Sequence, residues 1–190
     1  AELATDDSIG RLSALAGVKP DLAITHHRAR TLKVALYTED IVLMPFPSWL
    51  TADMARSVAD PTSDLANPLR GPFTAKRDPV TESGIAAVQL AKIARLLPAV
   101  LLVSIPKKNK LSKEDIARVG AAHVMDYELD SAGSLKQVTA AKVPLEDAED
   151  ARILAFRSSD GGREHLAIVI GEPASDRPVL VRLHSECFTG

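Results

Sequence analysis

The stretch that decides the fold class runs from Ser83 to Ile105 and reads SGIAAVQLAKIARLLPAVLLVSI. Apolar residues recur in its first part at helical spacing, for example at Ala86 and Leu90. This pattern predicts a helix that Pro98 ends. The run after Pro98 is apolar without alternation, which is typical of a strand buried on both faces. A helix followed by a buried strand indicates an α/β arrangement.

Local patterns predict further helices and strands on both sides of this stretch. Thr5 can cap a helix that Gly17 ends, and Thr51 can cap another. Residues 21–25 form a strand candidate between these two helices. After the buried strand, a pattern close to a capping box predicts a helix over residues 112–120.

Basic residues follow the strand predicted at 21–25. They are His26, His27, Arg28 and Arg30. Such a strand end could bind phosphate, but no acidic residue or cysteine lies nearby at the spacing of metal ligands. A solvated loop is therefore the favoured interpretation.

The pattern changes near the sequence Ser131-Ala132-Gly133-Ser134, which has linker composition. We place a linker at 131–136, between a first domain at 1–130 and a second at 137–190. The second domain shows successive strand patterns, predicted as an antiparallel meander, at 151–157, 165–171 and 178–184. The predicted fold class is α/β (α+β), an α/β domain followed by the start of a mixed α/β domain that opens with this meander.

Composition excludes several classes of protein. The net charge of −2 gives no electrostatic argument for binding nucleic acid or an anionic membrane. The single cysteine cannot form an intramolecular disulfide, which is compatible with a reducing cytoplasm. No apolar run approaches the roughly 18 residues needed to span a bilayer. The chain lacks an initiator Met and stops after Gly190, so it is expected to be a fragment.

The last nine residues, 182–190, read RLHSECFTG and bring several reactive side chains together. Arg182 can bind phosphate oxygens through its forked guanidinium, and Glu186 can accept a hydrogen bond. Cys187 is a candidate soft metal ligand. A zinc site takes at least three protein ligands, so one thiolate does not complete it.

The segment from Gln137 to Gly190 resembles the N-terminal part of GTP cyclohydrolase II. That family's usual form of the last piece is R-V-H-S-E-C-L-T-G-D, so Leu183 and Phe188 are conservative departures. The family's T-P-W-G-D piece near the start of this segment is missing, and the acidic pairs Glu146-Asp147 and Glu149-Asp150 lie there.

The resemblance implies roles for the motif. Cys187 would be one of three zinc ligands, and the other two would come from a C-x-C pair further downstream. Zinc-held water would open the imidazole ring of GTP and release formate and pyrophosphate, the first step of riboflavin biosynthesis. The GTP site would be lined by Arg182, Leu183, His184, Ser185 and Glu186.

The resemblance also implies properties of the whole protein. It would be a cytoplasmic homodimer that binds GTP, with no nucleic-acid or membrane partner. None of the family's catalytic residues lies within the 190 residues, so the fragment alone is expected to be inactive.

Residues 1–130 resemble the later part of 3,4-dihydroxy-2-butanone 4-phosphate synthase. The matching pieces are AELAT at 1–5, PLR at 68–70, AAVQLA at 86–91 and LPAVL at 97–101. That family uses Mg²⁺ held by an acidic stretch and a histidine. Ser83 stands where that family has this histidine, and Ile85 stands where it has a glutamate. Ser104 replaces a later active-site glutamate of the family.

These departures predict a degenerate, non-catalytic first domain, because a hard Mg²⁺ ion is not held by an isoleucine and a neutral serine. Two alternatives stay open. One is a bifunctional riboflavin enzyme that also has synthase activity and Mg²⁺. The other is a non-catalytic nucleotide-binding homologue, for example in pyrimidine catabolism.

Overall fold

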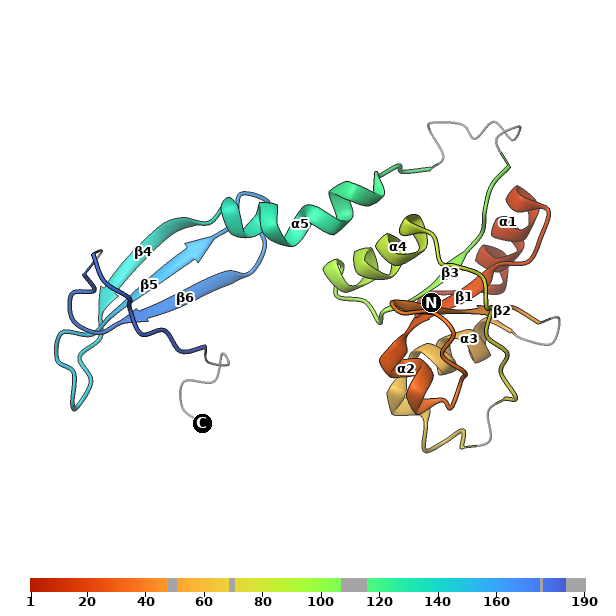
Figure 1. Ribbon diagram of the computed structural model, residues 1–190, viewed down its shortest axis with the longest axis horizontal. Coiled ribbons are helices and arrows are strands. Elements are labelled where there is room, and N and C mark those ends of the chain that lie inside the picture. Colours follow the sequence, from red (N-terminus) through yellow and green to blue (C-terminus); the bar gives the residue numbers. More distant parts are fainter. Residues whose placement is uncertain (48–50, 69–70, 107–115, 175, 184–190) are drawn as a thin grey trace. The chain divides into compact units, whose positions relative to one another are not determined.

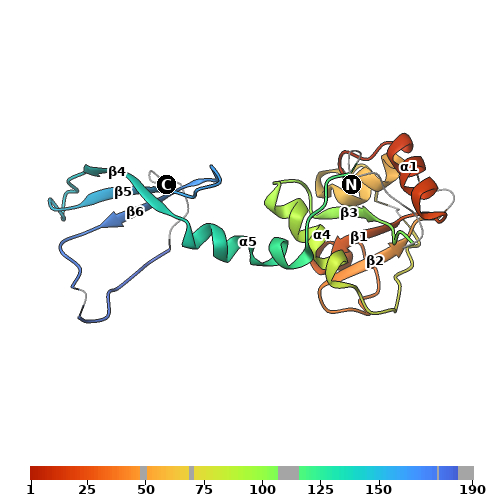
Figure 2. The ribbon, with the colours of Figure 1, turned by 90° about the horizontal axis from the view of Figure 1, so that it is seen from above.

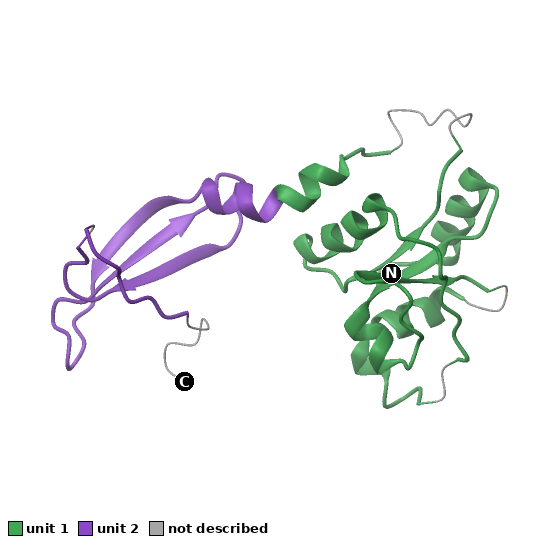
Figure 3. Ribbon diagram, in the orientation of Figure 1, with its two compact units in different colours: residues 1–126 green, residues 127–190 purple. Residues whose placement is uncertain are grey.

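The computed structural model describes residues 1–190 except 48–50, 69–70, 107–115, 175 and 184–190. The chain divides into two compact units, residues 1–126 and residues 127–190 (Figure 3). The elements of unit 1 are α1 Asp6–Ala16, β1 Asp21–Thr25, α2 His26–Thr31, β2 Ile41–Pro45, α3 Ala52–Ala59, the short 3-10 helix η1 Pro61–Ser63, α4 Glu82–Ile93 and β3 Ala99–Leu102 (Figure 1). Helix α5, Ala121–Gly133, crosses the division, and unit 2 contains β4 Lys136–Lys142, β5 Arg152–Arg157 and β6 Glu164–Val169.

The helix ends predicted at Thr5, Gly17 and Thr51 are confirmed. The end predicted at Pro98 is wrong, because α4 ends at Ile93 with Ala94 as its C-cap. The side chain of Thr5 accepts a hydrogen bond from the Ser8 backbone N–H, and Ser8 completes a capping box. Helix α1 ends at Gly17, which adopts a left-handed conformation with φ of 73° that glycine accommodates without strain. Thr51 caps α3 in the same way as Thr5 caps α1.

The sheet of unit 1 is antiparallel with the order β2-β1-β3, and Figure 2 shows the three strands side by side. Leu22, Ala23 and Ile24 of the central strand are fully buried. Leu22 and Ile24 pack in one cluster with Val58 of α3, whereas Ala23 packs with Val88 of α4. The sheet is thus covered by α2 and α3 on one face and by α4 on the other (Figure 1).

Two predictions around β3 need correction. The strand forms, but only Ala99 is fully buried, because β3 lies at the edge of the sheet in the described residues. The helix predicted over 112–120 is wrong in its described part, since residues 116–120 are not helical. Helix α5 begins just after Gly120 instead, and residues 107–115 lie outside the description.

The basic strand end after β1 is a helix rather than a loop. Thr25 caps α2, and this places Arg28 inward with only 6% of the residue exposed. Both terminal nitrogens of Arg28 donate to the Asp64 carboxylate at 2.7 Å, and its Nε donates to the Val58 carbonyl at 2.6 Å. Arg28 also donates to the carbonyl of Asp60 at 3.2 Å. The guanidinium therefore ties α2 to the segment that follows α3.

We expect Asp64→Ala to lower the free energy of unfolding of unit 1 by about 3 kcal/mol. This is the lower end of the range for breaking a buried ion pair, because Arg28 keeps its carbonyl partners. Urea unfolding followed by circular dichroism measures the loss. The control is Asp53→Ala, since Asp53 pairs with Arg56 at the surface and should cost less than about 1 kcal/mol. Equal losses in the two variants would contradict a special role for Arg28.

Unit 2 is an antiparallel meander with the order β4-β5-β6. The meander was predicted, and its strands at 151–157 and 165–171 correspond to β5 and β6. The third strand is β4 rather than the segment 178–184. Residues 131–133 of the predicted linker form the last turn of α5, and the strand begins at Lys136. The division into compact units falls after Asp126.

The second half of α5 is fastened to the turn between β5 and β6. The Tyr127 hydroxyl donates to the Asp160 carboxylate, and the Ser134 hydroxyl accepts from the Ser159 backbone N–H at 3.1 Å. Asp160 also accepts from the Ser158 hydroxyl and from the Gly162 N–H. These donors lower the pKa of Asp160 from 3.8 to about 2, with the Ser158 hydroxyl as the largest cause and Tyr127 next.

The lowered pKa of Asp160 makes this contact sensitive to acid. Because the folded pKa lies below the unfolded one, the stabilisation is complete above pH 3.8 and is lost as the pH falls through about 2. We expect NMR titration of the Asp160 carboxyl to show a midpoint near pH 2. Tyr127→Phe should raise that midpoint part of the way toward 3.8, whereas Tyr37→Phe should leave it unchanged. A midpoint unaffected by Tyr127→Phe would contradict the contact.

Candidate functional site

Two of the predicted GTP-site residues lie in the described part of the chain. Arg182 and Leu183 are exposed and belong to no helix or strand, and Leu183 is 94% exposed. The other predicted site residues lie outside the described residues. They are His184, Ser185, Glu186 and Cys187.

The strand predicted at 178–184 is not present over residues 178–183. Its apolar side chains are open to solvent, with Leu180 98% and Val181 77% exposed. An alternating apolar pattern forms a strand only where it can pair with a neighbouring edge and bury one face. In the described residues, the edge of β6 is not paired with this segment.

The chain leaves β6 toward the motif through a defined turn. Gly171 has a φ of 70°, a left-handed conformation, and an added Cβ there would meet the Asp150 carboxylate at 3.4 Å. Beside it, Arg152 donates to Glu172 at 3.2 Å. Glu172 is exposed, so this pair contributes little stability.

The described residues do not hold a complete donor set for a metal ion. The sequence contains one cysteine, Cys187. Across the described ranges, no group of three or more His, Cys, Asp or Glu side chains could hold a metal ion. Since zinc needs at least three protein ligands, these residues supply at most part of a site.

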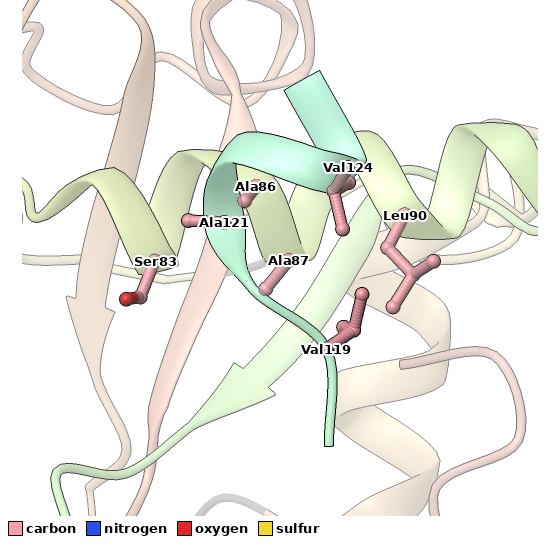
Figure 4. Close-up of a pocket in the computed structure, with 7 residues that line it drawn as sticks. All are labelled: Ser83, Ala86, Ala87, Leu90, Val119, Ala121 and Val124. Carbon is pink, nitrogen blue, oxygen red and sulfur yellow. The ribbon is translucent and has the colours of Figure 1, made fainter. Parts of the chain in front are cut away.

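Ser83, at the position of the synthase family's histidine, lines a small apolar pocket on the outer side of α4 (Figure 4). The pocket has a volume of about 120 Å³. Figure 4 shows the Ser83 hydroxyl as the one side-chain oxygen among the labelled residues. The other lining residues are Ala86, Ala87, Leu90, Val119, Ala121 and Val124.

The two other departures do not join Ser83 in one site. Ile85 packs on the sheet side of α4, in the cluster that contains Ala23 and Val88. Ser104 is exposed and follows β3. A divalent cation at Ser83 would meet methyl groups and one hydroxyl, a donor set that does not fit Mg²⁺.

The buried role of Arg28 was missed by sequence reasoning, which weighed this residue only as a phosphate ligand or a loop residue. Its guanidinium is occupied by Asp64 and backbone carbonyls. The phosphate interpretation of Arg28 is therefore wrong. Asp64 lies 36 residues away in the chain, and no local pattern points to it.

Comparison with known proteins adds what the geometry alone does not show. Residues 136–190 match the family model of GTP cyclohydrolase II. The chain is 40% identical over 189 residues to GTP cyclohydrolase-2 of Azospirillum brasilense, a match that covers 97% of this chain and 49% of that protein.

Over residues 136–190 this chain is similar to GTP cyclohydrolase II. It is also 32% identical over 160 residues to the riboflavin biosynthesis protein RibBA of Parabacteroides distasonis, covering 73% of this chain and 38% of that protein. A GTP cyclohydrolase-2 of Xylella fastidiosa is 32% identical to this chain over 115 residues. That match covers 55% of this chain and 27% of the Xylella protein. The chain thus spans about half or less of the length of these relatives.

The match to the GTP cyclohydrolase II model confirms the resemblance predicted from the motif and places it on unit 2 together with the end of the chain. No solved structure matches the chain significantly. Among the described helices, none is both long and apolar enough to cross a membrane.

Proposed function

We propose that this chain belongs to a GTP cyclohydrolase II that opens the imidazole ring of GTP by hydrolysis and releases formate and pyrophosphate. The step would be the first of riboflavin biosynthesis. One observation carries the proposal: the family match covers residues 136–190 and includes the complete run RLHSECFTG. The name of the Azospirillum relative, which aligns with nearly the whole chain, supports it.

In this proposal the motif supplies the nucleotide-facing edge. Arg182 is exposed, and its forked guanidinium suits the phosphate oxygens of GTP. Leu183, His184, Ser185 and Glu186 complete the GTP contacts, and Cys187 gives one thiolate to a zinc ion. When bound, zinc would lower the pKa of its water toward neutrality, but the ligands in this chain do not complete its site.

The incomplete donor set leads us to propose that residues 1–190 alone do not turn over GTP. The complete protein would be a homodimer in the cytoplasm, acting on GTP without a nucleic-acid or membrane partner. The relatives named riboflavin biosynthesis protein RibBA support the pathway.

For unit 1 we propose a non-catalytic relative of 3,4-dihydroxy-2-butanone 4-phosphate synthase, with a supporting or dimer-forming role. The observation behind this is the apolar surrounding of Ser83 and the position of Ile85 on the other side of α4. A bifunctional enzyme would need acidic or imidazole groups to converge there.

The cyclohydrolase proposal is tested with a chimera in which residues 1–190 replace the matched part of the Azospirillum protein. With GTP and zinc, the chimera should release formate, and residues 1–190 alone should not. Cys187→Ser should reduce turnover by at least about a hundredfold, because a direct ligand is lost. Arg182→Ala should lower kcat/KM by roughly ten- to a hundredfold, as expected for one charge-assisted hydrogen bond.

The matched control for Arg182 is Arg177→Ala, which removes an exposed arginine upstream of the motif and should leave kcat/KM unchanged. Formate release by residues 1–190 would refute the inactivity of this segment. A folded chimera that binds GTP without any formate release would instead favour a non-catalytic nucleotide-binding homologue.

The proposal for unit 1 makes a separate prediction. Restoring the synthase-like residues with Ser83→His and Ile85→Glu should not create a divalent-metal site, because the two positions face different sides of α4. Titration with Mn²⁺ followed by electron paramagnetic resonance measures binding. The unchanged chain should also fail to convert ribulose 5-phosphate. Conversion by the unchanged chain would support a bifunctional enzyme, and tight Mn²⁺ binding by the double variant would contradict the separation of the two positions.

A further inference from the structure

One face of the unit 2 sheet carries exposed apolar side chains on its outer strands, β4 and β6, while Ala155 on the central strand β5 is buried. Directly opposed residues of an antiparallel pair point to the same side of a sheet. Ala155 lies opposite both Thr139 and Leu166, and Ile153 lies opposite Ile168. Ala141 is also paired with Ile153. We name this surface the Leu166 face; it consists of Thr139, Ala141, Ile153, Ala155, Leu166 and Ile168.

The large side chains of the Leu166 face on β6 are open to solvent. Leu166 is 52% and Ile168 is 47% exposed, and every residue of β4 is exposed. The alternate residues of β6, Ala167 and Val169, are half-buried. Contiguous exposed apolar side chains mark an interaction surface.

Charged residues border the Leu166 face at one end. Arg157 and Glu164 are directly paired on the same side of the sheet and form an ion pair. Lys136 lies opposite Arg157 on the other neighbouring strand. An apolar centre with a charged rim is the usual composition of a protein interface.

We propose that the Leu166 face is the docking surface for the part of a GTP cyclohydrolase II domain that this chain does not match in its relatives. The inference rests on the proposed function. All three strands lie in the segment that matches the family, and the chain covers only 49% of the Azospirillum protein. About half of that relative is therefore available to cover the sheet.

A second copy of this chain is the weaker occupant. A symmetric contact confined to the Leu166 face would bring six residues from each copy, whereas a stable interface takes about 20–30 residues from each partner. The unmatched part makes up about half of the relative, which is larger than such a contact needs. Packing of a second layer on one face of a sheet is how most such domains complete their core.

Cysteine labelling of the chimera described above tests this inference. Leu166→Cys is introduced both in the chimera and in residues 1–190, and the rate of maleimide labelling at this site is followed by mass spectrometry. We expect labelling at least tenfold slower in the chimera. Leu65→Cys is the matched control, since Leu65 is 95% exposed in unit 1 and should react equally fast in both proteins.

Equal labelling rates for Leu166→Cys in the two proteins would show that the face stays open and would overturn the inference. Slow labelling in residues 1–190 that becomes faster on dilution would also overturn it, because a second copy would then be the cover. If the chimera aggregates, the unmatched part is added as a separate polypeptide; protection supports the inference and its absence refutes it. Protection without formate release would preserve this inference while refuting the proposed activity.

Discussion

Unit 1 depends on the complete burial of its central strand, β1. Leu22, Ala23 and Ile24 have no exposed surface, and β1 is hydrogen-bonded to a neighbour along both edges. Because successive side chains point to opposite faces, this one strand sets the position of α3 through Leu22 and Ile24 and of α4 through Ala23. Helix α2 starts directly at the end of β1, so the strand also sets where Arg28 meets its partners.

The parts of this fold that could be predicted have local causes. The helix ends at Thr5, Thr51 and Gly17 depend on hydrogen bonds or backbone conformations within a few residues. The neighbouring sequence is therefore sufficient to predict them. Arg28 could not be interpreted in this way, because its burial depends on Asp64, far along the chain. The alternation at 178–184 resembles that of β6, yet only β6 has a partner strand in the described residues.

Only part of the candidate site could likewise be predicted from the residues themselves. A lone cysteine is usually a buried thiol, so the residues of the motif alone did not justify a zinc ligand. The contiguous resemblance supplied that role as a hypothesis, and the match over 136–190 supports the family. At positions 83 and 85 the sequence predicted the loss of metal binding, because Ser83 and Ile85 stand where the synthase family has a histidine and a glutamate. The structure adds a geometric reason, since the two side chains lie on different sides of α4.

The two units differ in how they obtain their stability. Unit 1 encloses its apolar clusters between helices and a sheet, whereas the buried apolar residues among the described part of unit 2 are Ala151 and Ala155. Burial of apolar surface is the main favourable contribution to folding, so a sheet whose larger apolar side chains, such as Leu154 and Phe156, are only half-buried gains less from it. The motif begins only a short distance after this sheet. On the proposed function, a layer that covers the Leu166 face would add the buried apolar surface that the described part of unit 2 lacks, and would thereby stabilise the sheet that precedes the motif.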